Sequence, residues 1–376
     1  MSNNNNNEII SVAKPHTVKK FELIEKYVEG WIPKLLNSGF CDTLVFIDCM
    51  CNSGEYRDIN GNSVEGTAIR VAKLMRDASW QYPPKMLHIF LNDIDQRKIE
   101  HLETLLPTET INFKIHTSAQ DANEMLKFLG NYIRRMKNTH SLLVYDPYKA
   151  EIDWLACMPF FNTWSEVIIN HMISDAIRAM PVASKPDTIK KYEQTYQLPF
   201  EELLPFGTDR NAYEKQVEKI MSNMRIRKRE FYIAAFPFFN RNNSVVYNLI
   251  HYTTNPVGFK LFKSSAWHVF GGKSSTKNTH GNENQFVFDF DGNDTRITVA
   301  DEDCYYIQDI ASYLNSYFCG QQNIPLETLW SVLDEHPIFP SDGFRREIKK
   351  ELRDVHGATV SGLSLIHISE PTRLAL

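Results

Sequence analysis

Short apolar runs alternate with helix-like patterns along the first half of the chain. The apolar runs are rich in β-branched and aromatic residues, as buried strands are. They predict strands at 44–47, 86–91, 111–115, 141–145 and 166–170. Apolar residues at steps of three and four predict helices near 66–76, 96–106, 122–136 and 152–161. Strands that alternate with helices indicate an open parallel sheet, whose strands end at one ligand-binding edge.

Two further patterns flank this alternating region. Apolar residues at helical spacing predict an amphipathic helix after Pro15, with Thr17 as its N-cap. Strand-like runs at 231–236 and 245–251, separated by an Asn-rich turn, predict a hairpin. The polar residues 57–65 between the first strand and its helix are predicted to form a loop.

Composition divides the chain into segments. Residues 1–13 contain a run of asparagine and predict a disordered lead-in. Residues 14–270 hold the predicted α/β domain, and 271–284, rich in Gly, Ser, Lys and Asn, predict a linker. Residues 285–362 then show one hairpin pattern and three short helical patterns, which predict a small winged-helix-like module.

The last residues, 363–376, do not fit any of these segments. Their sequence LSLIHISEPTR is identified as what a common transposon-type sequencing adapter encodes. We therefore predict a non-native tail, and a C-terminal module that is truncated.

The turn after the first strand is the first candidate site. Asp48 ends that strand, and Asn52 and Gly54 follow in a turn-prone segment before Tyr56. A ligand that approaches bare backbone requires residues that tolerate positive φ, and glycine and asparagine are such residues. A strand, a tight turn and a helix form the first unit of nucleotide-binding α/β folds.

Two more acids follow the next strands. Asp93 ends the second strand, where a carboxylate can accept hydrogen bonds from both hydroxyls of a ribose. Asp121 follows the third strand and could sit beside an adenine amino group. It also directly precedes a helix, so it is equally a candidate N-cap, and the two roles are compatible.

Asp146-Pro147-Tyr148 follows the fourth strand. In amino-group methyltransferases a short motif of acid or amide, proline and aromatic follows this strand, accepts hydrogen bonds from the target NH2 and stacks on the base. The chain lacks one proline of the common four-residue form. The other interpretation is a strand that simply ends in a turn, with Pro147 stopping the ladder.

Composition and charge limit the alternatives. The net charge of −5 among 376 residues gives no global basic field, so any contact with nucleic acid must be local. The only dense basic run, 225–229, is either a solvated helix face or a phosphate-binding patch. No run reaches transmembrane length, and the six scattered cysteines give no zinc signature, so we expect a cytoplasmic protein without membrane or metal.

Acids at the ends of successive strands form the layout of an S-adenosylmethionine-dependent methyltransferase. The cofactor has a sulfonium and a zwitterionic amino acid but no phosphate, so it requires no phosphate-binding lysine loop. A dinucleotide enzyme would prefer GxGxxG at the first turn, where this chain has only Gly54. A hydrolase triad is disfavoured because no nucleophile elbow is present.

The chain resembles the three-Cys-motif partner proteins, a methyltransferase-like family. The resemblance covers most of residues 14–355 and rests on the order of short motifs. These are Pro15-His16-Thr17 with Lys20, Phe46-Ile47-Asp48, Gly54-Glu55-Tyr56, Asp93-Ile94-Asp95, Asp146-Pro147-Tyr148, Phe236-Pro237, Val246-Tyr247-Asn248-Leu249 and Pro337-Ile338-Phe339-Pro340 before Phe344–Leu352.

The resemblance implies a Rossmann-like class I methyltransferase sheet with helices on both faces, S-adenosylmethionine as cofactor, and a partner carrying a three-cysteine motif. It places Asp48, Gly54 and Tyr56 at the cofactor turn. It assigns the ribose to Asp93, the adenine to Asp121, and the reacting group to Asp146 and Tyr148, with Pro147 between them.

One position departs from the family. Asn52 stands in the first half of the turn, where many relatives have glycine, and its side chain takes up room. Two hypotheses follow. The chain is either an enzyme that methylates an exocyclic amine, with nucleic acid as the candidate target, or a non-catalytic platform for its partner.

Overall fold

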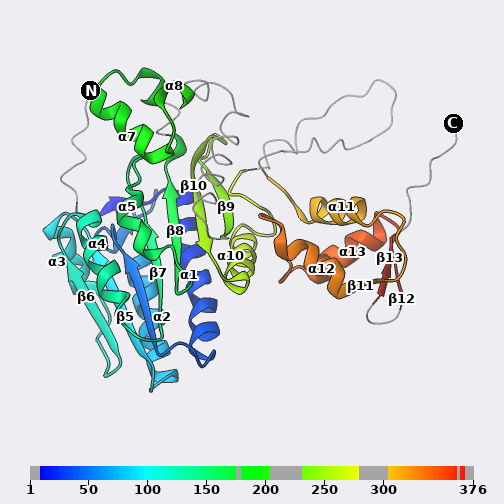
Figure 1. Cartoon of the computed structure of the whole chain (residues 1–376), viewed down its shortest axis with the longest axis horizontal. Coiled ribbons are helices and arrows are strands. Elements are labelled where there is room, and N and C mark those ends of the chain that lie inside the picture. The colour runs from blue at the N-terminus through cyan, green and yellow to red at the C-terminus, as the bar shows by residue number, and fades with distance from the viewer. Residues whose placement is uncertain (1–8, 175–178, 204–230, 279–303, 362–364, 369–376) are drawn as a thin grey trace.

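The computed structural model describes residues 9–174, 179–203, 231–278, 304–361 and 365–368 (Figure 1). The strands of its central sheet are β2 (Thr43–Asp48), β5 (Met86–Asn92), β6 (Phe113–Ser118), β7 (Thr139–Tyr145), β8 (Ser165–His171), β9 (Tyr232–Phe239) and β10 (Val245–Thr253). The helices of this part are α1 (Pro15–Leu36), α2 (Thr67–Gln81), α3 (Gln96–Leu105), α4 (Ala122–Ile133), α5 (Trp154–Cys157), α7 (Pro186–Tyr196), α8 (Phe200–Leu203) and α10 (Pro256–Val269).

The seven strands form one sheet in the order β6-β5-β2-β7-β8-β10-β9. Strands β2, β5, β6, β7 and β8 are parallel, and β10 runs antiparallel to both of its neighbours. The chain winds outward from β2 in one direction and from β7 in the other, so the order reverses between these strands, where doubly wound sheets bind ligands. This is the arrangement of a class I methyltransferase sheet, and the predicted fold class is confirmed.

Helices cover both faces because the central strands are apolar on both sides. Leu44 and Phe46 face one core with α1, α2 and α10, whereas Val45 and Ile47 face a second core with α4 and α5. All six residues of β2 are buried, as expected for a parallel strand between two helical layers.

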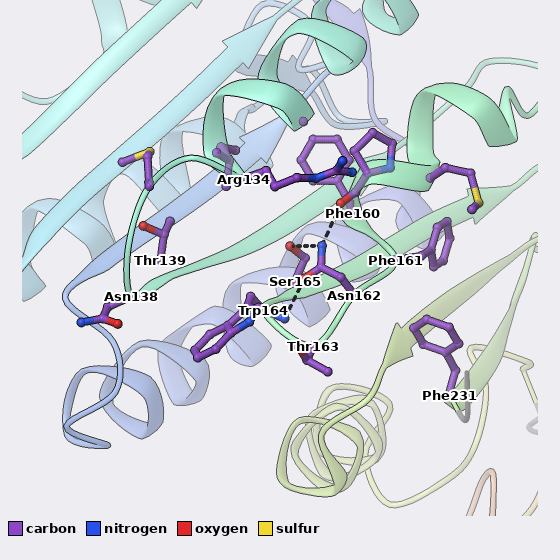
Figure 2. A pocket seen from close by; sticks show the side chains of 15 residues that line it. Arg134, Asn138, Thr139, Phe160, Phe161, Asn162, Thr163, Trp164, Ser165 and Phe231 are labelled. Carbon is purple, nitrogen blue, oxygen red and sulfur yellow. Dashed lines mark hydrogen bonds between the residues drawn. The ribbon is translucent and has the colours of Figure 1, made fainter. Parts of the chain in front are cut away.

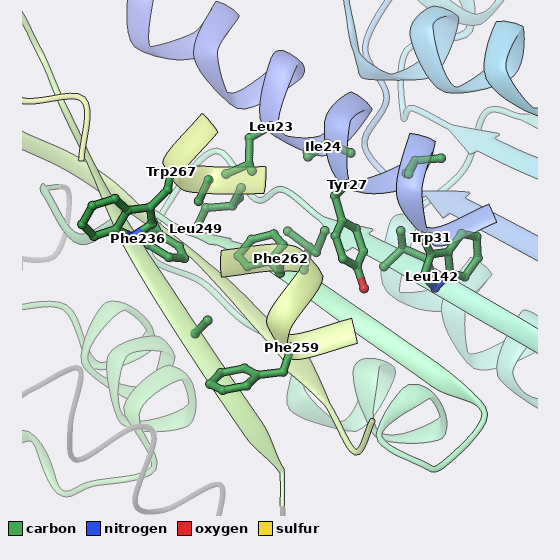
Figure 3. Close-up of a cluster of buried hydrophobic side chains, with 14 of the residues drawn as sticks. Leu23, Ile24, Tyr27, Trp31, Leu142, Phe236, Leu249, Phe259, Phe262 and Trp267 are labelled. Atoms are coloured by element: carbon green, nitrogen blue, oxygen red, sulfur yellow. The ribbon is translucent and has the colours of Figure 1, made fainter. Parts of the chain in front are cut away.

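The predicted hairpin is confirmed, and the structure gives it a place in the sheet. β9 and β10 pair antiparallel, and β10 also pairs with β8. Figure 3 shows Tyr27 of α1 beside Phe262 of α10, and Trp31 and Phe259 belong to the same core. The first helix and the last helix of the α/β part therefore share one core.

Two predictions about local structure are wrong. Helix α1 begins at Pro15 with Lys14 as N-cap, so Thr17 lies inside the first turn; proline is preorganised for the first helical position. Residues 57–65 are not only loop, because β3 (Glu55–Arg57) and β4 (Ser63–Glu65) form a hairpin. Strand β1 (Ser11–Val12) pairs with β3 and extends it to three strands.

Two other boundaries move for identifiable reasons. β6 starts at Phe113 rather than at Ile111, whose side chain is 91% exposed. The helix predicted at 152–161 is one turn of α5 followed by a 3-10 turn, Met158–Phe160. Pro159 cannot donate the backbone hydrogen bond that a continuing α-helix requires. A second 3-10 turn spans Met180–Val182.

The C-terminal residues form a separate small unit beside α10 (Figure 1). Its elements are α11 (Ile307–Tyr317), β11 (Ile324–Pro325), α12 (Leu326–Glu335), α13 (Arg345–Asp354), β12 (Thr359–Ser361) and β13 (Leu365–His367). The three predicted helices are confirmed, and the strands pair in the order β11-β13-β12. The predicted hairpin at 286–299 lies outside the described residues.

β13 is built from residues of the tail that we predict to be adapter-derived. Ile366 and Ile368 of this tail are buried. The origin of the tail stays a prediction, because pairing in a sheet does not reveal where a sequence comes from.

Helix α10 joins this unit to the α/β part. The Lys263 ammonium donates to the carbonyl oxygens of Leu333, Asp334 and His336 at 2.8, 3.1 and 2.6 Å. The Trp267 indole donates to the carbonyl of Ile338 at 3.0 Å. These bonds cap the end of α12 with side chains from another helix, so α12 is fixed against α10.

Candidate functional site

The first turn adopts the backbone that the sequence predicts. Asn52 and Gly54 both have left-handed φ, 57° and 75°. A side chain at Gly54 would place its Cβ 2.5 Å from Leu102 Cδ1, so this position requires glycine for space as well as for conformation. The Cys51 amide donates to the Asn92 carbonyl at 2.8 Å, which ties the turn to the end of β5.

Asn52 fills part of this turn with its side chain. Its amide nitrogen lies 3.3 Å from the Tyr148 hydroxyl and 3.3 Å from Ser11 Oγ, and it can donate to both. Its carbonyl oxygen accepts from the Ser53 amide at 2.7 Å. The departure from glycine therefore links the first turn to the residues after β7.

Asp93 lies buried at the end of β5 and faces the first turn. Its carboxylate accepts from the backbone amides of Asn52 at 3.1 Å and of Asp95 at 2.9 Å. The Lys98 ammonium is 3.9 Å away. The predicted ribose acid is thus held at the turn by two backbone donors.

Asp121 performs the N-cap role. Its carboxylate accepts from the amides of Asn123 and Glu124 at 2.9 and 3.1 Å, at the start of α4. The cap is confirmed, and the adenine contact stays a prediction.

Tyr56 lies in β3 with its ring packed on Phe21, at a centroid distance of 4.8 Å.

Asp146 follows β7 and has both carboxylate oxygens engaged. One accepts from the Lys20 ammonium of α1, and the other accepts from the Asn170 amide at the end of β8. The strand ends at Tyr145, and Tyr148, after Pro147, has 66% of its surface exposed. The Tyr148 ring also lies 5.8 Å from the Lys98 ammonium. The motif is therefore both a strand end and a fixed carboxylate beside an exposed aromatic ring.

Three acids and two lysines converge at this edge. Asp48 is paired in register with Leu91 and Val144, so it lies between the strand ends that lead to Asp93 and Asp146. Burial, together with the negative charge of Asp146, raises the pKa of Asp48 to about 7. The arrangement favours a ligand that brings positive charge to Asp48.

Some residues of the site were not predicted from the sequence. Asn170 could have been found because it ends the fifth strand, in the same way that the three acids end theirs. Ile94, directly after Asp93, was given no role from the sequence, and its side chain is 77% exposed. Lys98 carries no comparable signal, because its position depends on the start of α3. The basic run 225–229 lies outside the described residues.

A cavity of about 760 Å³ lies at the opposite ends of the strands. Figure 2 shows Thr139 and Ser165, which begin β7 and β8, with Arg134, Trp164 and Phe231 around it. The Asn162 amide donates to the Pro159 carbonyl at 2.7 Å and so shapes its wall. The cavity shares no lining residue with the cluster of acids, so it is separate from the candidate site.

Within the described residues, no helix has the length and hydropathy to cross a bilayer. The same part of the chain brings no three His, Cys, Asp or Glu side chains together in a way that could hold a metal ion. The six cysteines occur as free thiols, and only Cys319 is exposed.

Comparison with known proteins gives structural similarity alone. No protein-family model matches the chain. No curated protein matches it either. Among solved structures, a Legionella pneumophila protein of family DUF519 is similar at 11% identity and a TM-score of 0.38, over 66% of this chain and 92% of that chain.

Two solved methyltransferases are also similar. Human methyltransferase-like protein 13 in complex with SAH has 8% identity and a TM-score of 0.32, over 68% of this chain and 92% of that chain. A loganic acid methyltransferase with SAH has 10% identity and a TM-score of 0.25, over 70% of this chain and 88% of that chain. At these scores the similarity carries no argument, so the fold assignment rests on strand order and the site on its own geometry.

Proposed function

We propose that the protein is an S-adenosylmethionine-dependent methyltransferase. The observation that supports this most strongly is the convergence of Asp48, Asp93 and Asp146 on a first turn with left-handed Asn52 and Gly54. The acids suit a cationic sulfonium, and the turn beside them suits the amino-acid end of the cofactor. We assign the ribose to Asp93.

The exposed apolar side chain of Ile94 gives an adenine ring a surface beside the ribose acid. Asp121 follows the end of β6 closely and supplies the polar contact that we expect for the adenine amino group. When bound, the cofactor would supply an electrophilic methyl group.

The methyl acceptor that fits the other side of the site is an amine. The Asp146 carboxylate, held by Lys20 and Asn170, is positioned to accept a hydrogen bond from an NH2 group, and the exposed Tyr148 ring can stack on a planar base. In the reaction the S–CH3 bond breaks, an N–CH3 bond forms, and the amine proton passes to water. We propose an exocyclic amine of nucleic acid as the target.

A partner and a compartment complete this proposal. We propose a protein with a three-cysteine motif as the partner, on the strength of the family resemblance. The helix-strand-helix-helix-strand-strand order of the C-terminal unit supports a winged-helix-like module. The free thiols suit a reducing compartment such as the cytoplasm.

One observation favours a second candidate function, a non-catalytic platform. The Asn52 side chain occupies the turn and is bonded to Tyr148 and Ser11, which closes space that a cofactor would use. Under this alternative the fold binds its partner without methyl transfer.

Calorimetric titration of the full chain with S-adenosylmethionine and with its demethylated product tests the proposal. We expect micromolar binding that is lost in Asp93→Ala and retained in Asp121→Asn, because asparagine keeps both the N-cap of α4 and an oxygen that can accept from the adenine amino group. Absence of binding by well-folded protein would refute the cofactor assignment and support the platform.

Methyl transfer to adenine-containing nucleic acid is then measured with and without the Asp146→Ala change. Loss of transfer while cofactor binding persists is the expected result, because we assign the acceptor to Asp146 and the ribose to Asp93. An equal rate in this variant would contradict the role given to Asp146.

A further inference from the structure

Helix α13, Arg345–Asp354, has its charges sorted into separate faces. At 100° per residue the basic side chains of Arg346, Lys349, Lys350 and Arg353 fall within one arc of about 100°. Glu347, Glu351 and Asp354 occupy an adjoining arc, and Ile348 and Leu352 occupy the third. A basic stripe therefore runs along the whole helix.

Packing turns this stripe outward. Ile348 and Leu352 are fully buried and belong to the same core as Ile310 and Leu314 of α11. Because two residues one turn apart hold the apolar face against α11, rotation of α13 about its axis would expose them. Arg346, Lys350 and Arg353 are exposed and Lys349 is half-buried, so the basic arc faces solvent.

The cations of the stripe differ in how far they are already neutralised. Arg353 pairs with Asp354 at 2.7 Å. Among the described residues, Arg346, Lys349 and Lys350 have no ion pair or side-chain hydrogen bond. Arg345, outside the stripe, pairs with Asp342 at 2.7 Å and stacks on Trp330. Three cations thus remain available for an external anion.

We propose that the basic face of α13 binds the phosphate backbone of duplex nucleic acid. The chain as a whole has a net charge of −5, so this stripe is a local feature and not part of a general basic surface. The helix has ten residues, about 15 Å long, and a B-DNA major groove about 12 Å wide accepts an α-helix.

The position of the helix in its unit supports the same partner. α13 is the last of the three helices described for this unit, and Arg346, Lys350 and Arg353 on it are exposed. Repeated phosphates at fixed spacing match a straight row of cations better than an acidic peptide does, because the peptide must first be ordered.

This inference rests on the proposed function, in which nucleic acid supplies the methyl acceptor, but its test requires no cofactor. Fluorescence anisotropy of a labelled 20-base-pair DNA duplex, and of the matching RNA duplex, is measured with the full chain in 50 to 250 mM KCl. Failure of duplex binding and failure of cofactor binding are therefore separate results.

The test variant is Arg346→Gln/Lys349→Gln/Lys350→Gln. Each phosphate contact contributes about 8-fold to affinity in 0.1 M salt, so loss of three contacts should weaken binding by about 10²-fold or more. The slope of log affinity against log salt should become shallower by about 3. Glutamine is a good helix former, so circular dichroism should show an unchanged helix content.

A matched control removes three exposed cations far from α13. These are Lys34, Arg135 and Lys137, each changed to glutamine. Unchanged duplex affinity in this control, with weakened binding in the α13 variant, is the expected result. Equal losses in both variants would show a nonspecific charge effect and overturn the proposal.

Two further outcomes would also overturn it. One is absence of binding to either duplex by the parent protein in 50 mM KCl. The other is displacement of the duplex by polyglutamate of equal charge as efficiently as by unlabelled duplex, which would assign the surface to an acidic protein.

Discussion

Replacing Asp48 by asparagine should raise the free energy of unfolding, and the size of this increase should depend on pH. The pKa of the buried Asp48 carboxyl is raised from 3.8 to about 7. A raised pKa means that the folded state binds the proton more tightly than the unfolded state, so stability is lost as pH rises from 3.8 to 7. A shift of about 3 units corresponds to about 4 kcal/mol.

The assay is urea unfolding of parent and variant, followed by far-UV circular dichroism between pH 5 and pH 8.5. Linkage predicts that the difference in free energy of unfolding between Asp48→Asn and the parent grows by about 3 kcal/mol over this interval. The amide keeps the acceptor for the Met50 backbone N–H, which lies 3.4 Å from the Asp48 carboxylate.

Asp121→Asn is the matched control. Asp121 also lies at the carboxyl edge of the sheet, but it is exposed, and asparagine serves equally well as an N-cap. The difference in free energy of unfolding between Asp121→Asn and the parent should therefore be the same at every pH. If the Asp48→Asn difference were also the same at pH 5 and pH 8.5, the carboxyl would titrate normally, and burial beside Asp146 would not be the cause we give.

Three further changes test the packing around the site. Gly54→Ala should lower the free energy of unfolding by about 2–4 kcal/mol, measured in urea, because it combines a left-handed φ with a contact on Leu102. Glu166→Ala should cost about 3–5 kcal/mol in the same assay, because it removes the buried carboxylate that Tyr27, Trp31 and His251 share. Lys263→Met should expose the chain between α12 and α13 to limited proteolysis, because three carbonyls at the end of α12 lose their donor; cleavage at the parent rate would contradict this.

The sheet was predictable because its signals are local. Runs such as Leu44–Ile47 are apolar on both faces, which only a strand between two helical layers requires. The strand ends then placed Asp48, Asp93 and Asp146 at one edge without any knowledge of contacts. Their convergence follows from topology alone.

What the sequence did not reveal depends on pairing over long distances. The pattern predicted the β9–β10 hairpin but not its attachment to β8, because strand pairing at a sheet edge leaves no periodic signal. Asn170 and Lys20 were missed as ligands of Asp146 for the same reason: 24 and 126 positions separate them from it. The short β3–β4 hairpin was hidden by its polar composition.

The shared core of α1 and α10 has a consequence for synthesis of the chain. Roughly 220 residues separate the end of α1 from the start of α10, which at about 5–20 residues per second is about 10–45 s of translation. During that time Tyr27 and Trp31 lack the helix that covers them, and β8 lacks its neighbour β10. A nascent chain of this protein should therefore depend on chaperones until the β9–β10 hairpin and helix α10 have left the ribosome.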